Sequence, residues 1–294
     1  MTLGSEPTTP APHPQPSVPS FVPPPGSCDS HCHVFGPAAA FPFAENRTFT
    51  PHDVPKEALA RLHEQLGLDR ALIVQSACHG SDHRALVDAL RAGRGRYLGV
   101  ALLPASASRG DVAGLHEEGV RGLRLQFMPH LGAAPSDETV RELAALVTPF
   151  GWHLEVHVAG RGIADRFATF AALDAPVVID HLARVDLREG LDGDAVVALR
   201  RLLDTGHVWL KLSGVDRVSL TGAPYDDGIE LAALLAAQAP ERVLWGTDFP
   251  HPNISGPMPD DGALLDLIPR MVPDEHRRHL LLVDNPASLF DFGS

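Results

Sequence analysis

The segment LWGTDFPHP, residues 244–252, is the stretch from which the fold of this chain can be worked out. The apolar run that leads into it, residues 242–245, has the length of a buried strand and follows the breaker pair Ala239-Pro240. The run stops at Gly246, and the chain then carries a carboxylate, Asp248, on a loop stiffened by two prolines. A single Asp in such a place usually serves a turn or a helix cap. A second motif is needed before Asp248 can be interpreted as a functional residue.

That second motif lies near the other end of the chain, in the segment CDSHCH, residues 28–33. His31 and His33 alternate, so both rings lie on the same face of a strand end. Two imidazoles and a carboxylate, each at the end of an apolar run, are the components of an active site. We therefore expect the two ends of the chain to meet.

Composition limits the classes of protein to consider. The chain has 294 residues, enough for one large barrel or two smaller domains, and its hydrophobic (44%) and charged (21%) fractions are ordinary. A formal net charge of −13 argues against nucleic acid and against anionic membrane surfaces. An anionic substrate would then need a local cluster of Arg. Three cysteines favour a reducing compartment, and we interpret Cys28 and Cys32 as small strand residues.

Residues 1–26 form a segment rich in Pro, Thr and Ser, which has too little apolar surface to pack as a domain. We expect an extended or mobile tail there, laid on a neighbour or free, and a folded domain over residues 27–294. No apolar stretch approaches membrane-spanning length, and no charged segment followed by an apolar one resembles a signal peptide. The expected location is the cytoplasm.

From residue 27 onward, short apolar runs alternate with amphipathic segments. The eight runs end at or near His33, Gln75, Leu102, Gln126, Val158, His181, Ser213 and Asp248. Helical spacing covers residues 56–66, 81–93, 109–118, 137–147, 161–173, 194–204 and 227–238. This alternation predicts a single (β/α)8 TIM barrel. A doubly wound open sheet is the alternative, but no Gly-x-Gly-x-x-Gly or Walker-type loop follows any run.

Barrel enzymes place their chemistry at the carboxyl ends of the strands. The polar residues at those predicted ends are His31, His33, Gln75, Ser76, Arg124, His157, His181, Arg184, Arg217 and Asp248. Any one of them has a structural explanation, as a satisfied core histidine, a rim ion pair or a loop charge. Their joint placement indicates an active site.

These motifs resemble the amidohydrolase superfamily, of the amidohydrolase-2 type: a His-x-His on strand one, a His on strand six and an Asp on strand eight. Five segments further resemble the 2-pyrone-4,6-dicarboxylate lactonase group. They are CDSHCHVFGP (28–37), RGLR (121–124), VIDHLAR (178–184), KLSGVDR (211–217) and LWGTDFPHP (244–252). The resemblance extends from about Cys28 to the end of the chain.

The resemblance implies hydrolysis of a lactone, in many members without a bound metal. It assigns Asp248 as the general base. It assigns His31, His33 and His181 as the groups that polarise the lactone carbonyl. The guanidinium groups of Arg124, Arg184 and Arg217 would bind the carboxylates of the substrate. Physical chemistry supports this division, because ester hydrolysis needs a base beside the water and positive charge near the oxyanion. A partly protonated imidazole cluster could supply that charge. Ser76 or His79 is a further substrate contact, or a loop cap.

The chain also departs from that group at three positions. It has His130 where the lactonases have Arg, and Phe49 and His157 where they have Tyr. The loss of one guanidinium and two hydroxyls predicts a different pattern of substrate carboxylates. We therefore expect a carboxylated lactone, not specifically the pyrone dicarboxylate, with His130 among the substrate-binding residues.

Two other functions stay open. His31, His33, His157 and Asp248 form a set of N and O ligands of the kind that binds zinc, whereas the preferred mechanism needs no cofactor. A zinc-dependent lactonase, decarboxylase or hydratase, in which the metal acidifies the water, is the second hypothesis. A binding protein for a small dianion is the third, and Asp248 would repel its ligand. A homo-oligomer is also left open.

Overall fold

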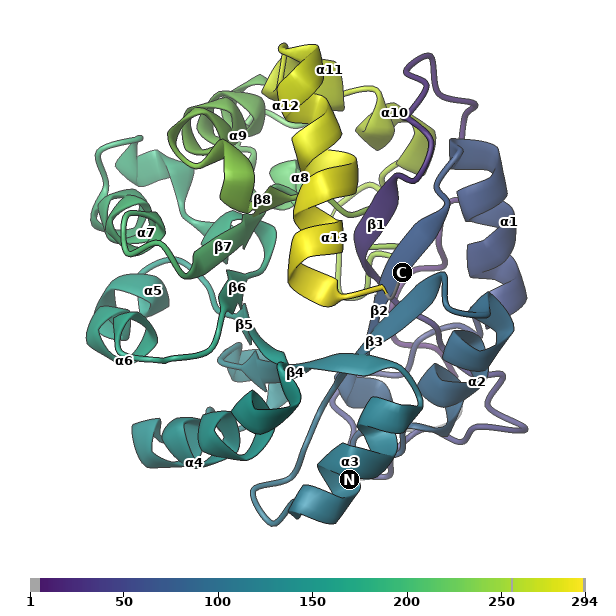
Figure 1. The fold of residues 1–294 in the computed structure, drawn as a ribbon. Coiled ribbons are helices and arrows are strands. Elements are labelled where there is room, and N and C mark those ends of the chain that lie inside the picture. Colours follow the sequence, from purple (N-terminus) through teal and green to yellow (C-terminus); the bar gives the residue numbers. More distant parts are fainter. Residues whose placement is uncertain (1–5, 255, 293–294) are drawn as a thin grey trace.

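The computed structural model describes residues 6–254 and 256–292 and has eight parallel strands arranged as a barrel (Figure 1). The strands are β1 (Cys28–Cys32), β2 (Arg70–Val74), β3 (Tyr97–Ala101), β4 (Val120–Gln126), β5 (His153–His157), β6 (Val177–Ile179), β7 (Val208–Lys211) and β8 (Val243–Leu244). Each strand pairs with the next in sequence order. The predicted barrel is confirmed.

Backbone hydrogen bonds between β1 and the segment after β8 bring the first and last strands together. The amide of Ser30 donates to the Trp245 carbonyl (2.8 Å), and the amide of Asp248 donates to the His31 carbonyl (2.8 Å). The two ends of the chain therefore meet as expected, and the alternative of an open sheet is wrong.

Helices surround the strands on the outside of the barrel (Figure 1). They are α1 (Lys56–Leu66), α2 (Arg84–Gly93), α3 (Arg109–Glu117), α4 (Asp137–Val147), α5 (Gly162–Asp165), α6 (Phe167–Ala171), α7 (Asp194–Leu203), α8 (Val215–Val218) and α9 (Asp226–Gln238). The sequence pattern located most of them, with two corrections. The segment 161–173 is split into α5 and α6 at Arg166, and α2 begins at Arg84.

Beyond β8 the structure has further helices that periodicity did not predict, because each is short. They are α10 (Asp261–Leu265), α11 (Ile268–Met271), α12 (Glu275–His279) and α13 (Asn285–Phe290). Figure 1 shows α13 lying across one end of the barrel. Its Phe290 is fully buried, clusters with Leu72, Val100 and Leu244, and lies 5.1 Å from the His153 ring at the start of β5. Helix α13 thus covers the amino ends of the strands and leaves the carboxyl ends for the site.

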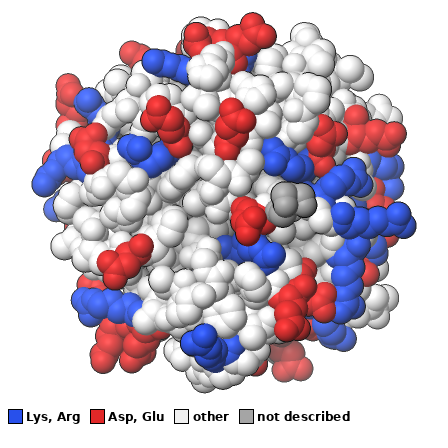
Figure 2. Space-filling view, viewed as in Figure 1, with Lys and Arg blue, Asp and Glu red and all other residues white. Residues whose placement is uncertain are grey.

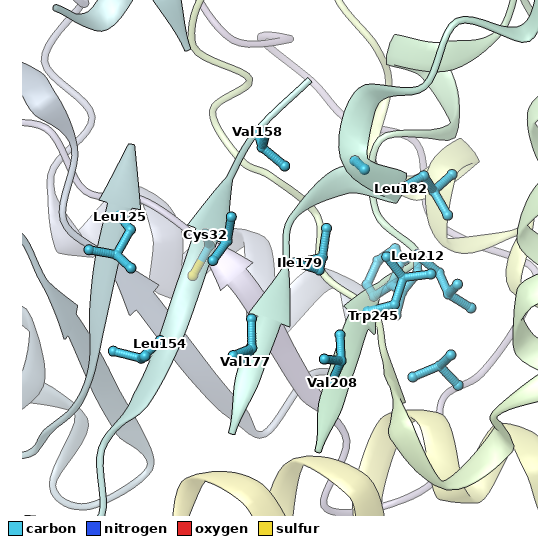
Figure 3. Packing of buried hydrophobic residues seen from close by; sticks show 14 of the residues in the cluster. Cys32, Leu125, Leu154, Val158, Val177, Ile179, Leu182, Val208, Leu212 and Trp245 are labelled. Atoms are coloured by element: carbon cyan, nitrogen blue, oxygen red, sulfur yellow. The ribbon is translucent and has the colours of Figure 1, made fainter. Parts of the chain in front are cut away.

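The main core lies between the strands and the helices. Figure 3 shows side chains such as Leu125, Leu154 and Ile179 packed along neighbouring strands, with Cys32 among them. Cys28 and Cys32 are buried, free residues of β1, as predicted, and burial raises the pKa of the Cys28 thiol to about 12. Both side chains are packed in the interior of the protein, as small strand residues.

The Pro-rich segment is laid along the barrel of its own chain. Residues 6–26 have no helix or strand, yet the amide of Thr8 donates to the Thr50 carbonyl (2.7 Å) and the Ser17 hydroxyl donates to Asp260 (2.8 Å).

The surface of the molecule carries both signs of charge. On the face shown in Figure 2, acidic and basic groups are interspersed. None of the helices in the described ranges is long and apolar enough to cross a membrane.

His153 in the barrel core makes stability sensitive to acid. Burial, together with the charge of Lys211, lowers the pKa of His153 to about 3. The unfolded chain takes up a proton near pH 6.5, whereas the native imidazole stays neutral, so this residue lowers the stability of the native state as the pH falls below 6.5.

We expect the wild type to lose on the order of 2 kcal/mol more stability than His153→Met between pH 7 and pH 4.5, measured by urea unfolding. The variant His276→Met, at an exposed position on α12, is the control and should follow the wild-type curve. Parallel curves for wild type and His153→Met would contradict the assignment of a buried neutral imidazole.

Candidate active site

The carboxylate of Asp29 holds together the two segments that carry the site. It is fully buried on β1 and accepts hydrogen bonds from the His31 amide (3.1 Å), the Thr247 amide (3.0 Å) and the Thr247 hydroxyl (2.7 Å). The His63 ring on α1 lies 3.1 Å from the same carboxylate. One acid thus fixes the His-x-His segment against the loop of Asp248.

Gly246 permits the close approach of these two segments. A Cβ atom at this position would lie 2.4 Å from the His31 amide nitrogen and 2.9 Å from the Asp29 carboxylate. No side chain fits there, so the glycine that ends the last apolar run is a requirement of barrel closure.

Asp248 lies at the centre of the site on a left-handed backbone (φ 62°). Its Oδ1 faces the Nε2 atoms of His33 (3.4 Å), His31 (3.7 Å) and His181 (3.7 Å). Its Oδ2 accepts from Arg217 Nε (2.6 Å) and lies 2.5 Å from Nη2 of the same guanidinium. Burial opposes ionisation, but Arg217 and the imidazoles outweigh it and hold the pKa of Asp248 well below its usual range. The group is a carboxylate at neutral pH.

The histidines around Asp248 are held by their second nitrogens. His33 Nδ1 lies 2.8 Å from the Val74 carbonyl, and His181 Nδ1 lies 3.0 Å from the Ser213 hydroxyl. Burial lowers the pKa of His31 to about 3 and that of His181 well below its usual value. The expected partly protonated cluster is therefore wrong for these two rings, because desolvation keeps them neutral. They act through N–H dipoles and lone pairs.

The segment from His181 to Arg184 brings an imidazole and a guanidinium into the same site. All four of its residues have positive φ angles, between 42° and 55°. Left-handed backbone is unfavourable for non-glycine residues, and runs of it are kept where the surroundings impose them, often at functional sites. The tight turn directs both side chains to one pocket.

The three predicted arginines differ in their partners. Arg124 donates to Asp180 (3.0 Å) and lies 3.5 Å from Glu155, and Arg217 is bound to Asp248. The guanidinium of Arg184 makes no hydrogen bond or ion pair to any residue that the structure describes, and its buried Nε has no partner. Burial and the nearby Arg217 lower the pKa of Arg184 to about 10, so it is still a cation at neutral pH.

An ionic cluster below Asp248 was not predicted. Glu155, Asp180 and Lys211 are fully buried on or next to β5, β6 and β7, and Lys211 contacts both acids and His31. Burial and Asp180 raise the pKa of Glu155, so the two acids compete for the positive charge of Lys211 and Arg124. Glu155 and Lys211 interrupt apolar strand runs, and that interruption is the sequence signal that was available.

One pocket collects almost all of the predicted residues. Its lining includes His33, Phe49, Ser76, Arg124, Gln126, His130, His157, His181, Arg184, Arg217 and Asp248. His31 is not part of the lining and lies beneath it, fully buried. His79 also lies outside the lining, and its Nε2 accepts from the Gly36 amide (3.2 Å), which is the loop-capping role. Both nitrogens of His157 lack a partner within the described chain.

Part of this site has the donor chemistry of a metal centre. Ligand atoms of His31, His33 and Asp248 lie within 4.8 Å of one another. Among the residues that the structure describes, no such group includes His157, the fourth predicted ligand. A neutral His33 whose Nδ1–H donates to a carbonyl presents its Nε2 lone pair, which is the orientation of a metal ligand. By ligand type and proximity, these two imidazoles and the carboxylate fit zinc, provided that each ring offers a lone pair to the ion.

A (β/α)8 barrel with a His-x-His on the first strand, a His after the sixth and an Asp after the eighth defines an amidohydrolase-type site. A family model described as "Amidohydrolase" matches residues 28–292, and the chain belongs to that family.

Individual relatives agree with this assignment. The chain is 40% identical to the 2-pyrone-4,6-dicarboxylate hydrolase of Comamonas testosteroni, over 94% of this chain and 93% of the relative. It is 39% identical to the 4-sulfomuconolactone hydrolase of Rhizobium radiobacter, over 92% of each. A crystal structure from Agrobacterium tumefaciens superposes with a TM-score of 0.84 at 29% identity, over 93% of this chain and 98% of that one.

The close approach at Gly246 gives a direct test of the contact between β1 and the loop after β8. We expect Gly246→Ala to destabilise the protein by about 3 kcal/mol, because the new methyl group must displace the His31 backbone. The control Gly114→Ala lies in α3 with nothing within 4 Å of the added methyl, and should be neutral or stabilising. Equal melting temperatures for the two variants would show that β1 and the loop after β8 are not in tight contact.

Proposed function

We propose that this protein is a hydrolase that opens a small anionic lactone. The observation that carries the proposal is the unpaired Arg184 guanidinium, which shares a pocket with an ionised Asp248. A partly buried cation without a counter-ion calls for an anionic ligand. A carboxylate bound there would hold the lactone beside the base, as the names of the two curated relatives would lead us to expect.

Asp248 is the proposed general base. Its Oδ1 and the Nε2 atom of His33 are 3.4 Å apart, and both accept hydrogen bonds when His33 is neutral with its hydrogen on Nδ1. A water molecule beside them can donate one hydrogen to each and direct an oxygen lone pair at the lactone carbonyl carbon. Asp248 then takes the proton as the new C–O bond forms.

The tetrahedral intermediate collapses when the ring C–O bond breaks. The proton on Asp248 passes to the departing ring oxygen, so that one water is consumed and a hydroxyl and a carboxylic acid are formed, and the acid then releases its proton to solvent. Arg217 keeps the pKa of Asp248 low, and Arg184 and Arg124 line the same pocket, where positive charge stabilises an oxyanion. The neutral His181 contributes an N–H dipole when the Ser213 hydroxyl donates to its Nδ1.

The anionic groups of the substrate are proposed to differ from those of a pyrone dicarboxylate. His130 lines the pocket, and partial burial with Arg184 and Arg217 nearby lowers its pKa, so it is not a fixed cation. Phe49 offers no hydroxyl. One strong anion site at Arg184 and weaker polar contacts at Ser76 and His130 therefore favour a carboxylated or sulfonated lactone with a single dominant anionic group.

A second candidate is a zinc-dependent version of the same reaction, and the group formed by His31, His33 and Asp248 favours it. His33 and Asp248 would hold the ion, and bound zinc would supply a water of lowered pKa. In either case Arg184 binds the anion.

The test is ultraviolet loss of 2-pyrone-4,6-dicarboxylate and of 4-sulfomuconolactone, before and after exhaustive chelation. We expect turnover of at least one lactone. Asp248→Asn should lower kcat by about 10²- to 10⁴-fold and still bind substrate. Arg184→Met should chiefly raise KM.

Each outcome separates the hypotheses. Loss of activity on chelation, with recovery on adding zinc, would support the metal-dependent version. The hydrolase hypothesis would be refuted if the wild type hydrolysed no anionic lactone while Asp248→Asn still bound anions. That result would support the third hypothesis, a binding protein for a small dianion.

A further inference from the structure

Lys211 is a fully buried cation whose position bears directly on the chemistry of His31. It lies on β7, and its Nζ is 3.0 Å from His31 Nδ1. The same ammonium contacts Glu155 Oε2 and lies 3.4 Å from Asp180 Oδ1. The contacts with His31 Nδ1 and Glu155 Oε2 are hydrogen bonds, and the contact with Asp180 is a longer ion pair.

The contact at 3.0 Å fixes which atom accepts. An ammonium group has hydrogens and no lone pair, so it can only donate. If His31 Nδ1 also carried a hydrogen, two donors would face each other. Asp180 Oδ1 is 3.2 Å from Nδ1, but the angle at the ring does not suit a hydrogen bond, and this oxygen has no hydrogen-bond partner among the described residues. His31 Nδ1 is therefore the acceptor.

A neutral ring that accepts at Nδ1 carries its hydrogen on Nε2. That Nε2 atom is buried, lacks a partner and lies 3.7 Å from Asp248 Oδ1. His33 has the opposite arrangement, because its Nδ1 is 2.8 Å from the Val74 carbonyl, which can only accept. When the His33 ring is neutral, Nδ1 therefore carries its hydrogen and a lone pair on Nε2 faces Asp248.

We propose that Lys211 is a positioning residue that fixes His31 as the Nε2–H tautomer, so that the two histidines of the His-x-His motif act in opposite senses. His33 accepts from the attacking water beside Asp248, and His31 directs its Nε2–H toward Asp248 Oδ1 from beneath the pocket. At 3.7 Å this N–H is not hydrogen-bonded to the carboxylate, and it acts as a dipole whose positive end faces Oδ1. The effect on rate rests on the proposed lactone hydrolysis, whereas the tautomer itself does not.

The tautomer also bears on metal binding. A nitrogen that carries a hydrogen has no lone pair for zinc. The Nε2 atom of His31 can therefore bind the ion only in the other tautomer, in which Nδ1 carries the hydrogen and Asp180 is the nearby acceptor. Lys211 opposes that tautomer by donating to Nδ1. This contact thus favours the arrangement that needs no ion.

The test uses two double variants that keep the buried charges balanced. Lys211→Gln with Glu155→Gln retains a donor at position 211, and Lys211→Met with Glu155→Gln removes it. Both leave the Arg124–Asp180 pair intact. Histidine-labelled ¹⁵N NMR reports the tautomer, with the His31 signals assigned by their loss in His31→Phe. We expect a lone pair on His31 Nδ1 in the wild type and the glutamine double variant, and a hydrogen on Nδ1 in the methionine double variant.

The kinetic expectation follows from the loss of one preorganised donor. The methionine double variant should lose about 10- to 100-fold in kcat with KM within about twofold, and the glutamine double variant should recover most of it. A hydrogen on Nδ1 of wild-type His31, or equal kcat and equal tautomers in the two variants, would overturn the proposal. The wild-type spectrum decides even where a variant does not fold. A correct tautomer without any lactone turnover would refute the proposed function alone.

Discussion

The closure of β8 onto β1 is the constraint on which the site depends. The Asp248 amide donates to the His31 carbonyl, and Asp29 binds the amides of both His31 and Thr247. The general-base candidate and the His-x-His motif are therefore placed by backbone hydrogen bonds and one buried acid, not by flexible side chains. A displacement of either segment would change every distance around Asp248. Gly246 allows this contact because its Cα approaches the His31 amide where no side chain fits.

Charge is arranged in two layers beneath and within the pocket. Below, Lys211 and Arg124 offset Glu155 and Asp180, so four buried ionisable groups sum to little net charge. Above, Arg217 offsets Asp248, and Arg184 makes no ion pair with any of the residues that the structure describes. Buried ions are tolerated when they are paired. An anion bound at Arg184, as proposed, would complete this balance at one point of a chain whose net charge is −13.

The sequence located the barrel and most of the pocket, because apolar runs and the residues that end them are local features. His33 directly follows a run, and His181, Arg184, Arg217 and Asp248 lie in the loops that follow three others, so strand ends predicted their convergence. The short helices after β8 lack the length at which periodicity is visible. The ion pairs that each buried side chain makes could not be predicted either. Nothing local to Arg124 indicates that Asp180 binds it while Arg184 stays unpaired, and burial, not composition, makes His31 neutral.

Neutral histidines change how such a site works on an anionic lactone. A cluster of imidazolium ions would bind an anion at the reacting centre and would add positive charge beside Asp248, whose pKa Arg217 already lowers. With His31 and His181 kept neutral by burial, the fixed positive charges of the pocket are guanidinium groups. Under the proposed function, Arg184 would bind the anionic group of the lactone and Asp248 would take the proton of the water, so binding and water activation would use different groups. That division would let binding energy orient the lactone beside the base.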